Sequence, residues 1–415
     1  MLDNKKIASY IASKRKLKGL TQQQVADALN ISFQAVSKWE NGTAYPTIEL
    51  LYALSELFGV TTDEILRATD SDEIGLTYTQ AGVNVSYTDT MKSEMAEYLS
   101  SSNPRVLNGL GSFASLYDIK FDDIPNPVLV LKSEEPGSKQ KLALKYGYTE
   151  SICHDLINHL VNDIIVMGAK PLAALDTIVC GNAEGDTIKA LVKGISEACR
   201  QNECDLVGGE TSIQPRVVEN STYVLSASIA GIVERGMIID GSKIQAGDKV
   251  IAVASNGLHT NGYSLVRFLM DKMPQIQNEK IAGEPFIDVI MKPHTPYYKC
   301  VKDLFGKRVI RGMAHITGGG IEGNLSRIIP KGLSSKIDLS KIIVPPIFKY
   351  IKGQGNIAEC EMLSTFNCGV GLVIIVNAEA KDMVLDEVSK FYDCYAIGEV
   401  VEGDKRVWFN DGVCW

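Results

Sequence analysis

The sequence predicts an all-α module at the N-terminus, followed by a larger two-domain part of the α/β or α+β class. Residues 1–68 show amphipathic helical patterns and no convincing strand. The next stretch, TDSDEIGL, is polar and acidic, as linkers are. From Tyr78 onward, strand-like runs alternate with helical runs in two halves of similar length. The expected boundaries are 1–68 for the helical module, 69–77 for the linker, and 78–241 and 242–412 for the two larger domains.

The bulk composition is typical of ordinary globular domains. The chain has 415 residues, 45% of them hydrophobic and 22% charged, and this length is too great for one core. A net charge of −8 argues against coating nucleic acid with the whole surface, while a local basic module is compatible with it. The nine cysteines form no C-x-x-C pair and signal neither a zinc site nor a disulfide framework, so we expect reduced thiols in a cytoplasmic protein. Because no run of eighteen apolar residues occurs, we expect no membrane span.

The N-terminal module is expected to contain five short helices. In the first, Ile7, Ile11 and Leu17 recur near helical spacing, and Gly19 closes it. Thr21 stands at the N-cap position of the second helix, QQQVADALN.

The third helix follows the second after almost no linker. Ser32 is its expected cap, and Val36 and Trp39 are expected to point into the core. Pro46 breaks the chain before a fourth amphipathic helix, IELLYALSELFGV. The fifth begins at TTDEIL, with Thr62 as its expected cap.

Two short helices joined by a tight turn fit a helix-turn-helix. The stretch LTQQQVADALNISFQAVSKWENG strongly resembles the Cro/repressor-type DNA-binding domain. The resemblance implies that Ser32–Glu40 is a recognition helix lying in the major groove of double-stranded DNA. The implied DNA-binding residues are Gln22, Gln23, Ser32, Gln34, Ser37 and Lys38.

A basic patch accompanies this helix. Residues 1–18 carry six Lys or Arg residues against one Asp. Lysine runs are usually only a solvated helical face, but this one lies beside a well-formed recognition helix. We therefore favour contact with DNA phosphates.

In the larger part, strands and helices are intermixed. Strands are expected at 126–133, 221–234, 243–255 and 369–377, and helices at 151–169, 186–202, 261–273 and 382–392. Between 273 and 369 the sequence indicates only a long variable region.

Four glycine-rich stretches stand out in the larger part. They are NGLGSF at 108–113, GGETS at 208–212, NGLHTNGYS at 256–264 and HITGGGIEGN at 315–324. In the last three, glycines follow a β-like run beside an expected helix start, where backbone N–H groups can converge on an anion. Most glycine clusters are simple turns, but several in one chain favour phosphate binding.

Several of these motifs together resemble aminoimidazole ribonucleotide (AIR) synthetase, also called phosphoribosylformylglycinamidine cyclo-ligase. They are GLHTNGYSLVR, HITGGGIEGN, MLSTFNCGVG, VNDIIVMGAKP and LVGGETS, and the similarity begins at YTQAGVNV and runs to about residue 400. It implies an AIR-synthase-like fold in which the first-domain sheets of two subunits form a dimeric barrel. It also implies that ATP, with Mg²⁺, phosphorylates a formyl amide before an imidazole ring closes.

The resemblance implies a set of site residues. The catalytic residues would be Lys139, Asp163 and His259, and the metal ligands Glu134, Asp163 and Glu210. Residues binding nucleotide or substrate would be Ser138, Asn162, Glu210, Thr211, Asn261, Gly318, Gly319, Gly320 and Asn324. Plainer alternatives stay open, because Lys139 could be surface, Asp163 a cap, and His259 and His315 ordinary hydrogen-bonded core histidines.

The segment SEEPGSK at 133–139 departs from the family pattern of aspartate, glycine, apolar residue, glycine, threonine and lysine. Glu134 replaces the aspartate, and Glu135 replaces a glycine, which could take a positive φ and approach phosphate closely. Pro136 removes a backbone donor. Further departures at ligand loops are Asn108, Ser112, the IQPRVVEN stretch after GGETS, and Gly323.

Two functions therefore stay open. In one, a DNA-binding protein carries a working ATP-dependent cyclo-ligase; in the other, a non-catalytic transcription regulator senses a purine intermediate or nucleotide through the same domains. In both, a homodimer would present two recognition helices to a palindromic operator.

Overall fold

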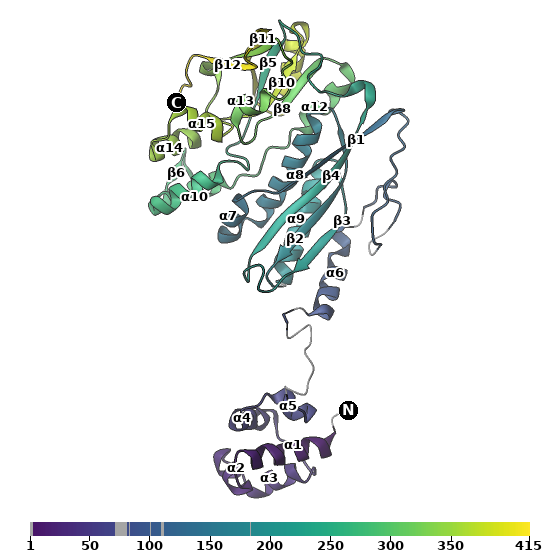
Figure 1. The fold of residues 1–415 in the computed structure, drawn as a ribbon, viewed down its shortest axis with the longest axis vertical. Helices are drawn as coiled ribbons and strands as arrows, with labels where there is room; N and C mark the ends of the chain where they lie inside the picture. The colour runs from purple at the N-terminus through teal and green to yellow at the C-terminus, as the bar shows by residue number, and fades with distance from the viewer. Residues whose placement is uncertain (1–2, 71–80, 83, 100, 109–111, 183) are drawn as a thin grey trace. The chain divides into compact units, whose positions relative to one another are not determined.

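The computed structural model describes residues 3–70, 81–82, 84–99, 101–108, 112–182 and 184–415 (Figure 1). The chain forms two compact units, residues 1–82 and 83–415, and each is described by itself. The expected linker and the YTQAGVNV stretch fall largely outside the described residues, as does the centre of NGLGSF.

The smaller unit is helical, as the sequence predicts, and its described residues include no strand. Its helices are α1 (Asn4–Leu17), α2 (Gln22–Ala28), α3 (Phe33–Glu40), α4 (Ile48–Phe58) and α5 (Thr62–Arg67). Its core is built from the inner faces of these helices, with Val25, Val36 and Trp39 buried. The prediction that Trp39 belongs to the core is confirmed.

Side-chain caps fix where these helices begin. Thr21 and Ser32 cap α2 and α3 as predicted, since each hydroxyl accepts a hydrogen bond from the backbone three residues on. The prediction for α5 is wrong by one residue. Thr61 is the cap, because its hydroxyl accepts from the N–H of Glu64, whose carboxylate accepts from the N–H of Thr61.

The larger unit begins with helix α6 (Val85–Leu99) and a four-stranded sheet of order β1-β4-β2-β3. The strands are β1 (Pro127–Glu134), β2 (Lys170–Cys180), β3 (Asp205–Ile213) and β4 (Tyr223–Glu234). Helices α8 (Thr149–Ile165) and α9 (Gly185–Gln201) pack on one face of the sheet, and α7 (Lys139–Tyr146) precedes them (Figure 1). Only β2 and β3 are parallel neighbours here, so the sheet is mixed.

A second, six-stranded mixed sheet has the order β12-β9-β11-β5-β10-β8. Its strands are β5 (Lys249–Ala254), β8 (Ile310–His315), β9 (Leu333–Asp338), β10 (Val370–Val376), β11 (Cys394–Glu402) and β12 (Val407–Asn410). A small hairpin joins β6 (Lys280–Ile281) to β7 (Glu284–Pro285). The helices are α10 (Tyr263–Lys272), α11 (Phe286–Ile290), α12 (Tyr298–Val301), α13 (Gly320–Leu325), α14 (Pro346–Gly355), α15 (Glu359–Thr365) and α16 (Lys381–Val388).

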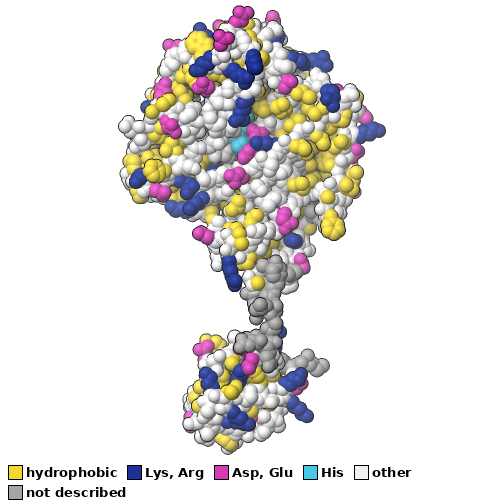
Figure 2. All heavy atoms as spheres, viewed as in Figure 1, with side chains coloured by type: hydrophobic (Ala, Val, Ile, Leu, Met, Phe, Trp, Pro, Cys, Tyr) yellow, Lys and Arg dark blue, Asp and Glu magenta, His cyan; other side chains and the backbone are white. Residues whose placement is uncertain are grey.

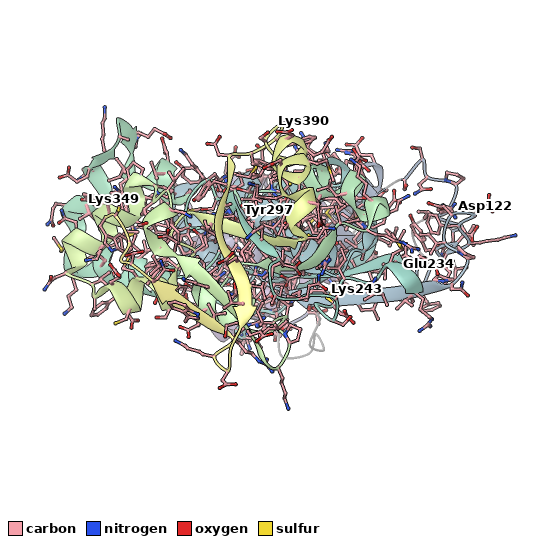
Figure 3. The ribbon with its side chains drawn as sticks, turned by 90° about the horizontal axis from the view of Figure 1, so that it is seen from above. Asp122, Glu234, Lys243, Tyr297, Lys349 and Lys390 are labelled. Carbon is pink, nitrogen blue, oxygen red and sulfur yellow. The ribbon has the colours of Figure 1, made fainter. Side chains whose placement is uncertain are left out.

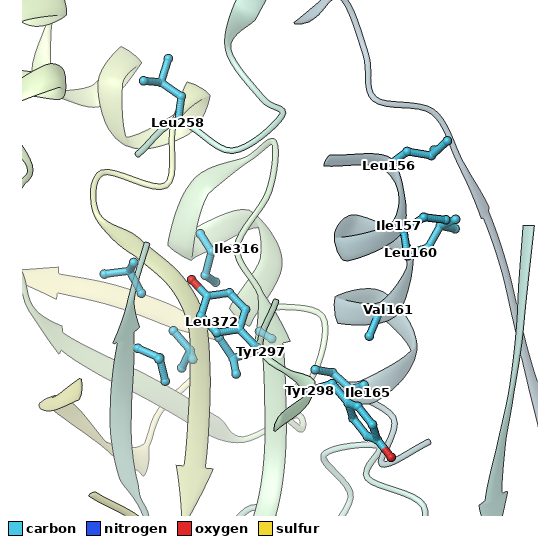
Figure 4. Packing of buried hydrophobic residues seen from close by; sticks show 14 of the residues in the cluster. Leu156, Ile157, Leu160, Val161, Ile165, Leu258, Tyr297, Tyr298, Ile316 and Leu372 are labelled. Atoms are coloured by element: carbon cyan, nitrogen blue, oxygen red, sulfur yellow. The ribbon is translucent and has the colours of Figure 1, made fainter. Parts of the chain in front are cut away.

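One continuous apolar core joins the two sheets of the larger unit. Tyr298 lies beside Ile165 at the end of α8, while Tyr297 points toward Leu372 of β10 (Figure 4). Seen from above, Tyr297 lies in the middle of the larger unit and Lys349 and Lys390 lie at its margin (Figure 3). The segment around residue 297 therefore ties α8 to the second sheet.

The prediction of a helical module followed by an α/β part is confirmed, and both large sheets of that part are mixed. One local expectation is wrong: GGETS lies inside β3 and is not a loop after a strand. Its glycines serve close packing, because a Cβ on Gly209 would lie 2.0 Å from a carboxylate oxygen of Asp176. Within the described residues, no helix has the length and apolarity to cross a bilayer.

Candidate ligand site and DNA-recognition helix

The segment SEEPGSK joins β1 to α7. Strand β1 ends at Glu134, and α7 begins at Lys139 with Ser138 at the N-cap position. Gly137 has a φ of +63°, which a glycine adopts without strain, whereas Glu135 is not among the residues with a positive φ. The backbone therefore accepts a glutamate at 135 without strain.

Lys139 is fully buried and is held by protein acceptors. Its ammonium donates to one Asp155 carboxylate oxygen at 2.9 Å, to the carbonyl of Lys292 at 2.7 Å and to that of His259 at 3.1 Å, and it lies 2.7 Å from the other Asp155 oxygen. Burial lowers the pKa of Lys139 and raises that of Asp155 to about 6, while their mutual attraction opposes both shifts. Lys139 thus joins three segments of the larger unit, and its contact with phosphate stays a prediction.

Two of the three expected metal-binding carboxylates lie together, but a lysine lies between them. The Lys132 ammonium is 3.0 Å from a carboxylate oxygen of Glu134 and 3.0 Å from one of Asp163. This is the position that a cation bridging the pair would take. Because Lys132 already supplies the positive charge, the pair does not fit a magnesium ion in this arrangement.

The third expected ligand, Glu210, lies elsewhere in the chain. It sits with Thr211 on β3, at the opposite edge of the sheet from β1. Three strand spacings separate those edges, about 14 Å. Within one chain, Glu134 and Glu210 therefore do not converge.

Between these edges lies Asp176 of β2, which sequence reasoning missed. Burial raises its pKa to about 7, and the nearby charge of Glu210 adds to the shift. In the PLAALDTIVC stretch this acid interrupts an otherwise largely apolar run, and that was the available signal.

The glycine-rich stretch at 315–320 follows β8 and leads into α13, as predicted. Two of its N–H groups are already used: Gly319 donates to the carbonyl of Ser364 at 3.0 Å and Gly320 to that of Thr317 at 3.1 Å. The Asn324 amide donates to the carbonyls of Gly318 and Gly320, at 3.2 and 2.8 Å. Asn324 therefore shapes this loop from within, and phosphate binding by its backbone stays a prediction.

Three predicted loops meet in space. A Cβ on Gly318 would lie 3.2 Å from the side-chain oxygen of Asn261, and one on Gly137 would lie 3.4 Å from the carbonyl of Thr260. Segments 134–139, 256–262 and 315–320 therefore adjoin one another, and Asp163 of α8 reaches the third through His315. We call this surface the loop junction.

Four of the five histidines gather at the loop junction. His315 Nδ1 is 2.7 Å from Asp163, and His315 Nε2 is 2.8 Å from His294 Nε2. His259 stacks on His294 with ring centroids 3.9 Å apart, and His159 lies edge-on to His315 at 5.1 Å. His159 and His294 were missed, because nothing in their sequence neighbourhoods marks them and they meet only in the fold.

Burial governs the charge of this cluster. It lowers the pKa of His259 and His294 well below the ordinary value and that of His159 to about 4. Burial alone would raise the pKa of Asp163, but hydrogen bonds from His315 and Lys132 outweigh it and hold that pKa well below its usual range. At neutral pH three neutral imidazoles thus lie near one ionised carboxylate.

Asn162 has an internal role. Its amide donates to the carbonyl of Thr295 at 2.8 Å and accepts from the N–H of Tyr297 at 3.0 Å. This fixes α8 to the 295–297 segment, and contact with nucleotide stays a prediction.

Figure 2 shows a histidine surface bordered by acidic and basic side chains near the middle of the larger unit. A pocket of about 950 Å³ reaches the histidine cluster at His294 and is also lined by His154 and Asn158. None of the predicted site residues lines that pocket. The motifs that are expected to bind ligand meet at the loop junction instead.

In the smaller unit, α3 presents polar side chains to solvent. Gln34 and Lys38 are exposed and Ser37 is half-buried. Two residues expected to reach DNA from α2 are bonded within the protein, Gln22 to Glu40 at 2.7 Å and Gln23 to Asp27 at 2.8 Å.

The basic patch is smaller than the sequence indicates. Arg15 is nearly buried and binds the Glu40 carboxylate at 2.6 and 2.9 Å, and Lys14 pairs with Asp70. Two of the six basic residues at 1–18 therefore have internal partners, and their charges are partly neutralised.

Family models match parts of both the smaller and the larger unit. The model for a helix-turn-helix matches residues 11–65, that for the AIR synthase related protein N-terminal domain matches 128–233, and that for its C-terminal domain matches 245–409. The class is thus a helix-turn-helix protein that carries both AIR-synthase-related domains.

Curated relatives define the family more closely. A phosphoribosylformylglycinamidine cyclo-ligase of Methylobacillus flagellatus is 40% identical over 311 residues, covering 75% of this chain and 90% of the relative. That of Geobacillus thermodenitrificans is 39% identical over 333 residues, covering 79% and 96%. The chain belongs to the phosphoribosylformylglycinamidine cyclo-ligase family.

Solved structures share the fold of the larger unit. Thiamine-monophosphate kinase from Stenotrophomonas maltophilia matches with a TM-score of 0.58 at 18% identity, over 80% of this chain and 98% of its own. HypE from E. coli matches with a TM-score of 0.56 at 18% identity, over 78% and 94%. At such identity, these likenesses establish the fold alone.

Proposed function

We propose that this cytoplasmic protein binds double-stranded DNA through α3 and carries out an ATP-dependent cyclo-ligase reaction at the loop junction. The meeting of segments 134–139, 256–262 and 315–320 at one surface is the observation that carries the proposal, since the family motifs lie on them. Residues 1–68 form the DNA-binding domain in this proposal, and 78–241 and 242–412 form the two cyclo-ligase lobes. The identity to curated cyclo-ligases supports the reaction, and the helix-turn-helix match supports the DNA binding.

In the proposed reaction, ATP phosphorylates the formyl amide oxygen of formylglycinamidine ribonucleotide, after which an internal nitrogen closes the ring and phosphate leaves. The partly exposed Lys132 ammonium is placed to meet phosphoryl charge at the edge of the loop junction. The pairing of Asp163 with His315 Nδ1 fixes the orientation of that ring, so a proton held on the imidazole has a defined direction.

The test is a turnover assay with formylglycinamidine ribonucleotide, ATP and Mg²⁺, following phosphate release and ring formation. We expect turnover in the common enzyme range of about 1–10³ s⁻¹. Lys132→Met should lower kcat by about 10²–10³, the usual effect of losing one charge-stabilising donor. Lys349→Met, an exposed lysine on α14, is the matched control and should leave kcat unchanged. Ring formation that is absent, while both ligands bind, contradicts the catalytic proposal.

A second candidate is a non-catalytic regulator that binds a purine ribonucleotide or nucleotide at the same surface. The position of Lys132 between Glu134 and Asp163 favours it, because a tethered ammonium replaces the cation that the reaction uses. This candidate predicts nucleotide binding without turnover and without a need for Mg²⁺. In Lys132→Met the freed carboxylates should make nucleotide affinity depend on Mg²⁺, as calorimetry with and without the ion would detect.

DNA binding would be that of a dimer in either case. A two-fold homodimer presents two copies of α3, which suits a palindromic operator with half-sites one helical turn apart. Selection of bound fragments from random-sequence duplexes tests this, since a palindromic consensus is expected. Recovery of a single half-site only would contradict the dimeric arrangement.

A further inference from the structure

The histidine cluster, in which the proposed reaction uses only the oriented His315 ring, also offers a metal-binding site. His259, His294 and His315 come from three separate segments of the second sheet's domain, and each is almost fully buried. One ring nitrogen from each lies within 4.8 Å of the others. Imidazoles brought together in this way from distant parts of a sequence form the usual donor set for borderline divalent metals.

A neighbouring group competes for the same ion. His159, Asp163 and His315 also place ligand atoms within 4.8 Å of one another. The Lys132 ammonium lies 3.0 Å from Asp163, however, so a positive charge already stands beside that group. The Coulomb repulsion between a lysine and a divalent ion makes the three-histidine group the better site.

Hydrogen bonds leave defined nitrogens for an ion. His259 Nε2 is 3.1 Å from the hydroxyl of Thr295 and 3.4 Å from the backbone nitrogen of that residue, while its buried Nδ1 has no partner. His315 Nδ1 is taken by Asp163, which leaves its Nε2 facing His294 Nε2. His294 Nδ1 is also buried without a partner. Unpaired buried nitrogen atoms are costly in a folded protein, and they point to a missing ligand.

We propose that His259, His294 and His315 bind one borderline divalent transition-metal ion, for which Zn²⁺ is the probe. Asp163 acts from behind His315 as the carboxylate that fixes the tautomer and orientation of a metal-bound imidazole. Three histidines leave a fourth position open to water or a small ligand. This inference goes beyond the proposed cyclo-ligase reaction and rests on the geometry of the three histidines.

Metal binding requires only a small rearrangement. The Nε2 atoms of His294 and His315 are 2.8 Å apart, while two nitrogens on a tetrahedral zinc ion lie about 3.3 Å apart. The His259 ring, which stacks on His294, must also turn to direct its Nδ1 at the ion. The donor set excludes Mg²⁺ as the natural occupant, because Mg²⁺ prefers oxygen ligands.

The experiment uses the full chain, stripped of metal with a chelator and titrated with Zn²⁺ by calorimetry. We expect one ion per chain in the wild type and at least a 100-fold loss of affinity in His294→Ala and in His315→Ala. Asp163→Asn should lose about 10–100-fold, as other removals of a ligand-orienting carboxylate do. His154→Ala is the matched control, because His154 is equally buried but lies outside the cluster, and it should bind like the wild type.

Cobalt(II) spectroscopy separates this site from the nine cysteines. An all-histidine site gives the visible bands of tetrahedral cobalt without the near-ultraviolet bands of thiolate ligands. If the alanine variants fail to fold, His294→Gln and His315→Gln keep the volume and a polar end, and circular dichroism checks their fold. The proposal is overturned if the wild type binds no ion. It is also overturned if the His294 and His315 variants bind Zn²⁺ with the affinity of the wild type.

Discussion

At the scale of single residues, the ion pair between Lys139 and Asp155 shows how a loop motif can serve the fold. Both side chains are fully buried, and the Asp155 carboxylate also accepts from the backbone N–H of His294. The pair thus connects α7, α8 and the 292–294 segment. Taking two charges out of water costs several kcal/mol, which their attraction and hydrogen bonds must offset.

Lys139→Met should destabilise the larger unit by about 3–5 kcal/mol, because Asp155 is left buried without a counter-charge. The double variant Lys139→Met/Asp155→Leu should recover most of that loss, since neither charge remains. Urea denaturation measures the free energies. Lys141→Met, an exposed lysine on the same helix, is the control and should change stability by less than about 0.5 kcal/mol. A single variant no less stable than the control would show that the pair contributes nothing.

A second, largely buried ion pair joins Arg15 to Glu40, and it makes the stability of the smaller unit depend on pH. Burial alone would raise the pKa of Glu40, but hydrogen bonds from Arg15 and Gln22 outweigh it and hold the pKa below its ordinary value. A carboxylate with a lowered pKa contributes stability that is present above its unfolded value of about 4.3. That contribution is lost as the pH falls through the folded value.

Glu40→Gln should therefore destabilise α1–α3 by about 1–3 kcal/mol at pH 7, and the difference from wild type should shrink below about pH 4. Hydrogen exchange of residues 3–70, compared with wild type at each pH, measures it. Asp63→Asn removes the exposed Asp63–Arg67 pair and should change little at any pH. A Glu40→Gln difference that stays constant down to pH 3 contradicts the assignment.

Sequence patterns single out residues that lie in motifs, but they do not show which distant residues those side chains contact. Lys139, Asp163 and His259 stand out in the sequence because they lie in recognisable motifs, and their roles in catalysis stay predictions. Lys132 and His294 do not stand out, because each acquires its meaning from a residue more than twenty positions away. Periodicity and motif spacing carry no information on such long-range contacts.

At the scale of elements, α3 carries the expectation of DNA recognition. Gln34 and Lys38 lie exposed on one helix whose opposite side buries Val36 and Trp39. Thr21 and Ser32 cap the two helices of the motif, so local sequence alone fixes their starts.

Gln34→Ala should cost about 1–3 kcal/mol of DNA affinity and relax specificity at one base pair. Lys38→Ala should weaken binding and lower the salt slope of the affinity by about one. Fluorescence anisotropy with a selected operator at several salt concentrations measures both. Lys349→Ala, an exposed lysine of the larger unit, is the control. Unchanged affinity in both α3 variants would mean that another surface reads DNA.

Element prediction failed where polarity or glycine masked the pattern. Between 273 and 369 the sequence indicates only a variable region, yet this region contains β8, β9 and several helices. Strand β8 contains Arg311 and ends in His315, and so it lacks an unbroken apolar run. In β3, glycines stand where close packing of Asp176 demands them, and they mimic a loop.

At the scale of the whole molecule, the first sheet has one face on which, among the described residues, several leucines are exposed. Leu129 and Leu131 of β1 are paired in register with β4, and Leu175 of β2 is paired with Ser228 of that strand. Directly paired residues share a face, and these leucines are 49%, 71% and 46% exposed. Helices α8 and α9 pack on the other face, and the proposed homodimer would pair through this one.

Leu131→Lys should convert a homodimer into monomers, because it places a charge in an interface that must bury about 800 Å² per subunit to be stable. Sedimentation velocity measures the oligomeric state. Val217→Lys is the control, since Val217 is 77% exposed but lies outside the sheet. A wild type that sediments as a monomer at micromolar concentration contradicts the dimer, and with it the palindromic operator.

The central proposal is that one chain carries DNA binding and a site for a purine-pathway ligand, and that the two binding events are coupled. The most direct measurement is the operator affinity of the full chain with and without ATP and formylglycinamidine ribonucleotide, at concentrations that calorimetry shows to be saturating. The account predicts a shift of at least about fivefold, with a reciprocal shift in ligand affinity when DNA is added. Identical DNA-binding curves at saturating ligand would contradict it.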